Sequence, residues 1–250
     1  MEHITSRKNK ILLHLKSLSL DGDYRRQCGE YVCDGETLLR EAVAAGAEIS
    51  CVLWGDGAGI KLSDTIPQYS CQKELMQSVS PLKNSPGPVF SVKIMPPVGA
   101  AAVNSALILE TVQDPGNVGT VIRTAAAFGI DTVILTGDCA DLYSPKTVRA
   151  TMGAVFRQRV LELGLESVKD YVNQNRLKLY GAALSDTAAD IKQTELCRAA
   201  VAIGSEGRGL SRELLSICHG QLIIPMEPGS ESLNAAVAAA VIMWEMKNRQ

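Results

Sequence analysis

The stretch ALILETVQDPGNVGTVIRTA, residues 106–125, runs from an apolar strand pattern through a tight turn into a helix. Gly116 and Gly119 let the backbone of the turn approach a ligand closely, and the N-terminus of the helix favours anionic groups. Arg123 falls one to two turns into this helix. An ordinary strand-to-helix turn with a surface arginine has the same pattern. The stretch lacks the glycine spacing of the common phosphate-binding loops, which argues against the usual nucleotide-binding folds.

The rest of the second half repeats this alternation of short apolar runs and helical patterns. We expect strands at residues 106–110, 132–135, 177–183, 199–203 and 221–224, and helices at residues 118–128, 144–152, 166–175, 211–217 and 233–248. Strands that are apolar throughout are typical of parallel sheets with both faces buried. The pattern therefore predicts an α/β domain whose mostly parallel sheet is flanked by helices.

A proline-rich segment separates this half from the beginning of the chain. Five of the ten prolines lie between residues 81 and 97, which is typical of loops and linkers. Before it, the patterns predict helices at residues 4–20, 36–45 and 72–79 and strands at residues 31–33, 49–54 and 89–94. We therefore expect a smaller α/β domain at residues 1–97 and a larger one at residues 98–250.

The composition excludes some classes of protein. With 46% hydrophobic residues among 250, the chain is not disordered. Its 25 basic and 27 acidic residues give a net charge of -2, so a nucleic-acid partner has to bind local basic clusters. Residues 1–26 form one such cluster, with six basic and three acidic residues and a net charge of +3.

Cysteine and histidine usage indicates the compartment and the absence of a metal site. Seven cysteines without C-x-x-C spacing, and a start without the apolar core of a signal peptide, predict reduced thiols in the cytoplasm. No apolar stretch is long enough to cross a bilayer, so we expect no membrane partner. The three histidines are isolated from one another and from any paired cysteine, so we expect no metal.

Two further segments carry polar residues that a simple core does not need. Residues 203–211, IGSEGRGLS, follow an apolar strand and surround Glu206 with glycines. Residues 223–234 lead from the last strand into the C-terminal helix and end in Ser232-Leu233-Asn234. Local helix capping explains Ser211, Ser232 and Asn234 equally well. Parallel sheets bind ligands beyond the carboxyl ends of their strands, so these loops form one site if their strands are neighbours.

Together the three segments resemble the motifs of the SpoU (TrmH-like) branch of the SPOUT methyltransferases, which transfer a methyl group from S-adenosyl-L-methionine to a ribose 2′-hydroxyl in RNA. The resemblance rests on DPGNVG with Arg123, on GSEG with GLS, and on IPM with Ser232-Leu233-Asn234, in the order and spacing of the family. Residues 4–9 and 31–36 are similar to the family's L30e-like substrate-binding domain. Residues 144–154, SPKTVRATMGA, look like the members that modify ribosomal RNA.

The resemblance implies an architecture and a substrate. A deep trefoil knot is expected at about residues 200–240, although knots are rare exceptions to the usual connection rules. A homodimer through the knotted C-terminal domain and an RNA-binding L30e-like domain at residues 1–97 are also implied. We expect 23S ribosomal RNA as the substrate. The alternatives are a transfer RNA substrate, an RNA-binding protein of this fold that has lost catalysis and, more distantly, a nucleotide-dependent oxidoreductase.

The resemblance also assigns roles to individual residues. Catalysis falls to Arg123, Asn117, Glu206 and Asn234, with Arg123 either assisting deprotonation of the ribose hydroxyl or stabilising the alkoxide, in one version across the dimer. Asn117 would position Arg123 or the ribose, and Glu206 would hold Arg123 or Asn234. Contacts to S-adenosyl-L-methionine are expected at Gly204, Ile224, Leu233, Leu184 and Ser232. RNA contacts are expected at Arg7, Lys8, Lys10, Arg25, Arg26 and Arg149.

Overall fold

The structure, a computed structural model, describes residues 1–55, 59–96, 102–185, 188–227 and 232–249 and consists of two compact units. The first unit contains Met1–Pro96 together with Asp141–Phe156, and the second contains the rest of the described chain. The boundary expected between residues 97 and 98 lies outside the described residues. The sequence-based division left Asp141–Phe156 in the second domain, whereas the structure places this segment in the first unit.

The first unit is a mixed sheet with helices on both faces. Its strands are β1 (Glu2–Ile4), β2 (Glu30–Asp34), β3 (Ile49–Trp54), β4 (Gln68–Cys71) and β5 (Val89–Lys93), in the order β1-β4-β3-β5-β2. Its helices are α1 (Lys10–Leu20), α2 (Gly22–Cys28), α3 (Glu36–Ala44), α4 (Lys73–Val79), α6 (Pro145–Ala150) and the 3-10 helix η1 (Ala154–Phe156). Strand β5 runs antiparallel to β2 and β3, and the other pairs are parallel.

The helix predicted at residues 4–20 is wrong in its first part. Ile4 belongs to β1, where it pairs with Cys71 of β4, and α1 begins only at Lys10. Asn9 explains this start, because its side chain accepts a hydrogen bond from the backbone N–H of Ile11 at 2.8 Å and so caps the helix. Strand β4 was not predicted, since its four residues carry no strong apolar alternation.

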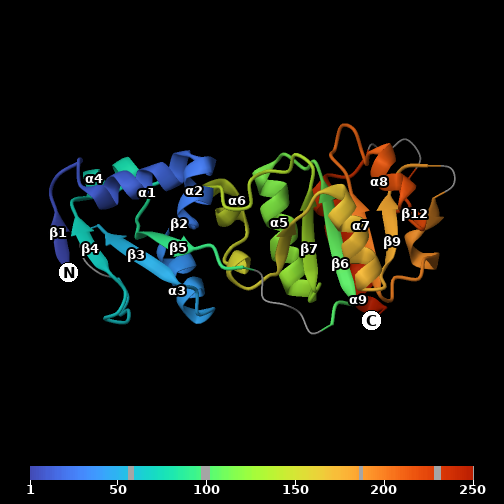
Figure 1. Ribbon diagram of the computed structural model, residues 1–250, viewed down its shortest axis with the longest axis horizontal. Helices are drawn as coiled ribbons and strands as arrows, with labels where there is room; N and C mark the ends of the chain where they lie inside the picture. The colour runs from blue at the N-terminus through green and yellow to red at the C-terminus, as the bar shows by residue number, and fades with distance from the viewer. Residues whose placement is uncertain (56–58, 97–101, 186–187, 228–231, 250) are drawn as a thin grey trace. The chain divides into compact units, whose positions relative to one another are not determined.

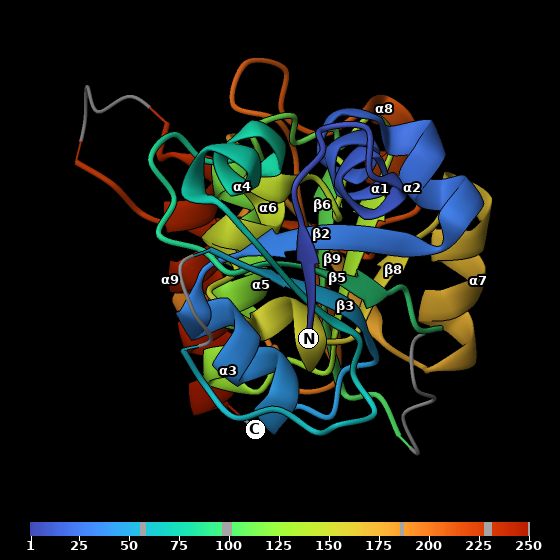
Figure 2. The same cartoon turned by 90° about the vertical axis from the view of Figure 1, so that its left-hand side faces the viewer.

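Alternate residues of the first sheet pack against opposite layers of helices. Val32 faces the core that α1 and α4 form, and its neighbour Tyr31 faces the core that α3 and α6 form. The two layers are visible as α1 and α4 above the strands and α3 below them (Figure 1) and again in the view from the end of this unit (Figure 2). Val148 of α6 is 1% exposed in the second core, which explains why Asp141–Phe156 belongs to this unit.

The second unit is a sheet in which every pair of strands is parallel, as predicted. Its strands are β6 (Ser105–Glu110), β7 (Thr132–Thr136), β8 (Val160–Glu162), β9 (Lys178–Ala182), β10 (Ala189–Asp190), β11 (Ala199–Ile203) and β12 (Gly220–Ile223), in the order β10-β12-β9-β11-β6-β7-β8. Its helices are α5 (Pro115–Phe128), α7 (Leu165–Gln174), α8 (Arg212–Ser216), α9 (Ala235–Asn248) and the 3-10 helix η2 (Ile191–Gln193).

Helices cover both faces of this sheet. Side chains of α7 and α8 form one core with alternate residues of β6 and β11, among them Ile108 and Ala202. Helices α5 and α9 lie side by side and contact the strands as well. They run parallel, because Asn117 at the start of α5 contacts Asn234 at the start of α9, while Phe128 and Trp244 contact each other near their ends.

The strand order brings four loops to one edge of the sheet. Strands β12, β9, β11 and β6 are consecutive neighbours, and all of them run in the same direction. The segments that follow their carboxyl ends therefore lie next to one another. These segments contain the three motifs of the sequence, so the condition that their strands be neighbours is met.

Candidate functional site

A pocket of about 390 Å³ lies where these loops meet. It is lined by Leu184 after β9, by residues of the loop 204–210 after β11, by Ile224 and Met226 after β12, and by Ser232, Leu233 and Ala235 at the start of α9. Its volume falls within the range of about 300–1,000 Å³ that is usual for small-molecule sites. All five residues predicted to contact the cofactor, namely Gly204, Ile224, Leu233, Leu184 and Ser232, line this pocket.

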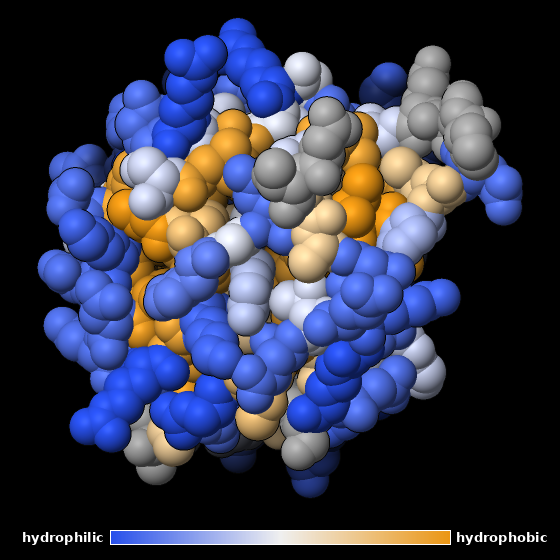
Figure 3. All heavy atoms as spheres, turned by 90° about the vertical axis from the view of Figure 1, so that its right-hand side faces the viewer, coloured by the Kyte–Doolittle hydropathy of each residue, from blue (hydrophilic) through white to orange (hydrophobic). Residues whose placement is uncertain are grey.

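Apolar side chains are exposed at the pocket. Leu184 is 67% exposed although it is a large apolar residue. The view of this end of the second unit shows apolar residues gathered in the upper half of the face, surrounded by hydrophilic side chains (Figure 3). An exposed apolar patch with a polar rim is typical of a ligand-binding site.

Three of the predicted catalytic residues form one closed network of hydrogen bonds. The side-chain amide of Asn117 donates to Glu206 Oε1 at 2.9 Å, and the amide of Asn234 donates to the same oxygen at 2.6 Å. The Asn234 amide also donates to Asn117 Oδ1 at 3.1 Å. A carboxylate that accepts two amide donors restricts the orientation of both, so the network presents a preorganised polar surface.

The capping role that explains Asn234 locally is also present. Its Oδ1 accepts hydrogen bonds from the backbone N–H groups of Ala236 and Val237, at 2.9 and 3.3 Å, and thereby caps α9. Its Nδ2 is left for the network with Asn117 and Glu206. The side chain of Asn234 therefore caps α9 and also takes part in the polar network of the site.

The loop 204–210 folds back on itself tightly at Gly204. A Cβ at this position would lie 2.1 Å from the carbonyl carbon and oxygen of Gly209 and 2.5 Å from the nitrogen of Leu210. The backbone N–H of Gly209 donates to the carbonyl of Ser205 at 2.9 Å, which closes the turn. Only glycine allows this approach, so the glycine at the end of β11 determines the shape of the pocket wall.

Arg123 does not join the network. It lies on α5 six positions after Asn117, which at 3.6 residues per turn places the two residues about 120° apart around the helix. The side chain is exposed and has no hydrogen bond or ion pair with the part of the chain that the structure describes. The expected contacts of Arg123 with Asn117 and with Glu206 are therefore absent in the single chain, where Glu206 holds Asn117 and Asn234 instead.

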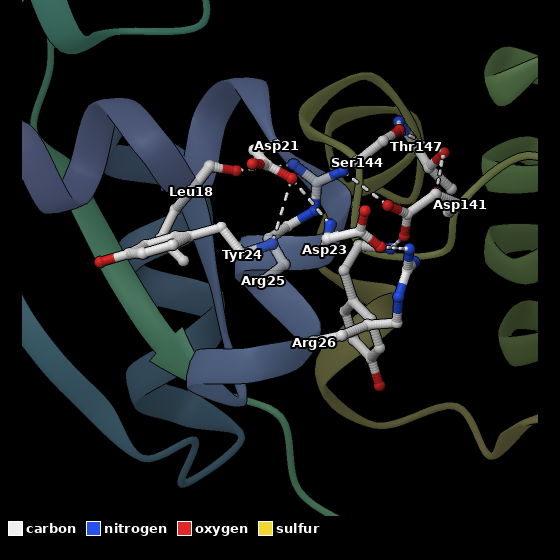
Figure 4. Close-up of polar contacts among 10 residues, drawn as sticks. Leu18, Asp21, Asp23, Tyr24, Arg25, Arg26, Asp141, Ser144 and Thr147 are labelled. Atoms are coloured by element: carbon white, nitrogen blue, oxygen red, sulfur yellow. Dashed lines mark hydrogen bonds and ion pairs between the residues drawn. The ribbon is translucent and has the colours of Figure 1, made fainter.

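One of the predicted RNA contacts, Arg25, is corrected by the structure. Its side chain is 7% exposed and donates to the carbonyl of Leu18 at 2.6 Å and to Asp141 Oδ2 at 2.6 Å (Figure 4). Asp141 also accepts from the backbone N–H of Tyr143 at 2.8 Å. A guanidinium that is buried against these partners holds Asp141–Phe156 on the first unit, and burial keeps its remaining donors, among them an unpartnered Nε, away from phosphate groups in solution.

The remaining predicted RNA contacts lie on the surface of the first unit. Arg7, Lys8, Lys10, Arg26 and Arg149 are exposed. Arg26 pairs with Asp23, and both side chains are largely in solvent (Figure 4). Burial raises the pKa of Asp34, and hydrogen bonds from Ser80 and Ser85 and the charge of Arg149 oppose this rise. Arg149 is therefore close enough to influence a buried carboxyl group while its own side chain stays exposed.

Sequence reasoning missed residues that the fold brings to the pocket. Arg208 and Met226 line it, and Glu110 at the end of β6 holds the residue that follows the loop 204–210. Arg208 and Met226 lie inside the recognised motifs, so their position in these motifs could have identified them as pocket residues. Glu110 gave only a weak signal, an acidic residue at the end of an apolar strand.

Two features are absent from the described residues. No helix among them is both long and apolar enough to span a membrane. They also contain no group of three or more His, Cys, Asp or Glu side chains arranged to hold a metal ion.

Comparison with known proteins identifies relatives over the whole chain. Residues 104–244 match the SpoU rRNA Methylase family. The chain is 32% identical over 99% of its length to the 23S rRNA (guanosine(2553)-2′-O)-methyltransferase RlmP of Bacillus subtilis, covering 100% of that protein. It is 30% identical over 99% of its length to an uncharacterized tRNA/rRNA methyltransferase of Synechocystis, covering 94% of it.

Two solved structures have the same fold. The AdoMet-bound rRNA methyltransferase of Sinorhizobium meliloti matches with a TM-score of 0.88 over 99% of this chain and 97% of that chain, at 22% identity. The SpoU methyltransferase AviRb of Streptomyces viridochromogenes, in complex with AdoMet, matches with a TM-score of 0.84 over 96% of this chain and 98% of that chain, at 25% identity.

Proposed function

Because this chain belongs to the SpoU rRNA methylase family, we propose that it transfers a methyl group from S-adenosyl-L-methionine to a ribose 2′-hydroxyl of RNA, with 23S ribosomal RNA as the substrate. The observation that carries the proposal is the pocket beside the network of Asn117, Glu206 and Asn234. It combines a small-molecule site with fixed polar groups at the edge of a parallel sheet.

The lining of the pocket suits this cofactor. S-adenosyl-L-methionine supplies an electrophilic methyl group when it is bound. Apolar side chains such as Leu184 and Leu233 would pack against its adenine, and backbone groups of Gly204 and Ile224 would supply hydrogen bonds to it. We call residues 204–210 the cofactor loop, because six of them line the pocket.

The network beside the pocket would position the substrate. A ribose hydroxyl is a poor nucleophile at neutral pH, so it has to be aligned with the methyl group and helped to lose its proton. Asn117 would orient the ribose with the amide hydrogen that the network leaves free, and Asn234, whose two amide hydrogens go to Glu206 and Asn117, would hold Asn117 in place. This role requires no movement of the network when the substrate arrives.

Arg123 would act on the hydroxyl itself. An arginine stays protonated at neutral pH, which makes it a weak base and a strong electrostatic stabiliser of an alkoxide. Both roles, proton acceptor and stabiliser, demand that the guanidinium reach the ribose. Because Arg123 lies on a different side of α5 from Asn117, we propose that it reaches the site of a partner subunit.

A homodimer supplies that partner. Helix α9 exposes Val237 and Trp244, which are 50% and 53% exposed and lie two turns apart on the same side of the helix. Trp244 packs on Phe128 of α5 with ring centroids 5.7 Å apart, so the exposed apolar residues continue onto the helix that carries Arg123. Large exposed apolar residues of this kind favour association with a second copy.

The C-terminal region would form the trefoil knot that the family resemblance implies. Strand β11 lies between β9 and β6, β12 lies beyond β9, and α9 then returns to pack on α5. This strand order, in which neighbouring strands are not consecutive along the chain, supports a knot at about residues 200–240. The pocket would then be formed by the loops of the knot itself.

The first unit would be the L30e-like domain that binds the RNA substrate. Its exposed basic residues Arg7, Lys8, Lys10, Arg26 and Arg149 would contact phosphate groups, which add affinity without reading sequence. Arg149 belongs to the segment 144–154 that looks like the members acting on ribosomal RNA. We place this activity in the cytoplasm, which suits a chain whose seven described cysteines form no disulfide with one another.

A methyl-transfer assay with labelled cofactor tests the proposal. Purified protein should transfer tritium from S-adenosyl-L-methionine to 23S ribosomal RNA and much less to transfer RNA, and nuclease mapping should place the label on a ribose. Preferential labelling of transfer RNA would support the alternative substrate. RNA binding without any methyl transfer would overturn the enzymatic proposal and leave an RNA-binding protein. Mapping 2′-O-methyl sites in a deletion strain and its parent identifies the nucleotide.

A further inference from the structure

Glu110, which the proposed mechanism does not use, lies at the carboxyl end of β6. Both oxygens of its carboxylate bind Ser211. Its Oε2 accepts a hydrogen bond from the backbone N–H of Ser211 at 2.7 Å, and its Oε1 accepts one from the Ser211 hydroxyl at 2.6 Å. Hydrogen bonds to an ionised acceptor are roughly twice as strong as neutral ones. The pair connects the end of β6 to the residue after the loop 204–210, and the two residues lie 101 positions apart in the sequence.

Ser211 directly follows the cofactor loop. Leu210 directly before it is 9% exposed and lines the pocket, and the Ser211 hydroxyl accepts from the backbone N–H of Leu214 at 3.1 Å, capping α8. Glu110 therefore holds the point where the wall of the pocket passes into a helix. Burial and, to a smaller extent, the charge of Glu110 raise the pKa of the neighbouring Cys218 to about 11, so this thiol adds no second negative charge.

The beginning of the cofactor loop is held separately. Gly204 packs against the backbone of Gly209, and Glu206 is bound to Asn117 and Asn234. Between these attachments Gly207 and Arg208 are exposed. With its beginning bound to the polar network and its end bound to Glu110, the loop is clamped on both sides of the pocket.

We propose that Glu110 is a positioning residue for the cofactor, which holds the end of the cofactor loop through Ser211 and keeps the pocket in its binding shape. The inference rests on the proposed function, since it assigns Glu110 to the S-adenosyl-L-methionine site. A loop that is already ordered pays less conformational entropy on binding, so loss of the clamp should weaken cofactor affinity. Steps that follow cofactor binding should change little, because Glu110 touches neither the polar network nor Arg123.

The test measures cofactor binding by calorimetry and steady-state methylation for Glu110→Ala and Glu110→Gln. Loss of the charge-assisted pair in Glu110→Ala should raise the Kd and KM for S-adenosyl-L-methionine about tenfold, with kcat and the KM for RNA changed less than about twofold. Glu110→Gln can still accept from the Ser211 N–H and should bind within about threefold of the wild type. In a Glu110→Ala background, Ser211→Ala should change cofactor affinity little, because the carboxylate that its hydroxyl binds is already lost and only the cap of α8 remains to be removed.

Asp131→Ala is the matched control. Asp131 accepts hydrogen bonds from the backbone N–H and hydroxyl of Ser105, at 3.0 and 3.1 Å, and from the N–H of Asn104. This is the same carboxylate–serine chemistry at the opposite end of β6, away from the pocket. The control should lose comparable stability in urea unfolding and keep its cofactor affinity.

The outcomes separate the clamp from the proposed function. If the wild type binds S-adenosyl-L-methionine and Glu110→Ala binds it equally well, or if Glu110→Ala and Asp131→Ala lose the same affinity, the positioning role is overturned and the methyltransferase remains. If the wild type binds no cofactor, the positioning role of Glu110 and the proposed methyltransferase function are both overturned. If Glu110→Ala does not fold, Glu110→Asp carries the test, because its shorter side chain cannot reach both the N–H and the hydroxyl of Ser211, and unchanged cofactor affinity in this variant counts against the clamp.

Discussion

The side-chain amide of Asn234 lies 2.6 Å from Glu206 Oε1, although 28 positions of sequence separate the two residues. This one contact joins the loop after β11 to the start of α9. Because Asn117 donates to the same oxygen, all three motifs meet at a single carboxylate. The site is therefore built around Glu206, and Arg123 is the predicted catalytic residue that remains outside it.

Arg123→Ala should abolish methylation and leave cofactor binding nearly unchanged. Arg123 is not among the residues that line the pocket, whereas loss of a group that stabilises charge in the transition state costs on the order of 10²–10³ in kcat. The rate is measured with labelled cofactor and the affinity by calorimetry. Arg212→Ala, an exposed arginine on α8, is the control and should keep full activity. Methylation by Arg123→Ala at nearly the wild-type rate would remove Arg123 from the mechanism.

Mixing two inactive variants tests whether Arg123 acts across a dimer. Arg123→Ala keeps an intact polar network, and Asn234→Ala keeps an intact arginine. In a mixed dimer, the network of the first subunit can meet the arginine of the second, so one complete site should form and activity should return. Refolded mixtures are assayed against each variant alone. Absence of recovery in mixtures that do form mixed dimers would place Arg123 in the site of its own subunit.

Gly204→Val should reduce affinity for S-adenosyl-L-methionine by at least about tenfold, because overpacking of this kind costs 1–3 kcal/mol or more. The new side chain would start 2.1 Å from the backbone of Gly209 and push the cofactor loop out of shape. Gly207→Val is the matched control in the same loop, since no atom lies within 4 Å of the Cβ position of Gly207. Calorimetry that finds equal affinities for the two variants would contradict the proposed pocket.

Arg25→Ala should destabilise the first unit by about 3 kcal/mol, since removing one partner leaves the remaining groups of a largely buried ion pair without compensation. Arg26→Ala, which breaks an exposed pair with Asp23, should cost less than about 0.5 kcal/mol. Urea unfolding measures both. RNA binding should show the reverse order under conditions in which both variants are folded. A larger loss of stability in Arg26→Ala would refute the assignment of Arg25 as the structural residue.

The buried carboxylate of Glu30 should make the stability of the first unit depend on pH. Burial by itself raises the pKa of Glu30, but hydrogen bonds from Lys93 at 2.7 Å and His14 at 3.1 Å outweigh it, and the pKa lies below its ordinary value of 4.5. A carboxyl group with a lower pKa in the folded state stabilises the protein above its unfolded pKa, and this contribution is lost as the pH falls through the folded pKa.

Glu30→Gln should therefore be less stable than the wild type at neutral pH, and the difference should shrink as the pH falls below about 4.5. Urea unfolding between about pH 7 and pH 3 measures this. Glu36→Gln, in an exposed pair with Arg40, is the control and should have a small effect. A difference between Glu30→Gln and the wild type that is the same at every pH would contradict the role of ionised Glu30.

Much of the second unit was predictable because its signals are local. The apolar runs of β6, β7 and β11 and the caps of α5 and α9 lie within a few residues of the elements they define. The motif residues follow their strands directly. The sequence therefore identified the loops that form the pocket but not how these loops are arranged in space. The short strands β4, β8 and β10 were missed, since two to four residues give too short a pattern.

Local sequence therefore specified a parallel α/β unit, the three motif loops and five of the residues that line the pocket. The tertiary structure alone decided that Arg25 is a buried anchor, that Asp141–Phe156 belongs to the first unit, and that Glu110 holds Ser211. The physical reason is that helix periodicity and capping depend on neighbours along the chain, whereas burial and pairing depend on residues about a hundred positions away. An arginine that the sequence suggests is exposed can be free to contact RNA or can be buried in an ion pair, depending on which residues the fold packs against it.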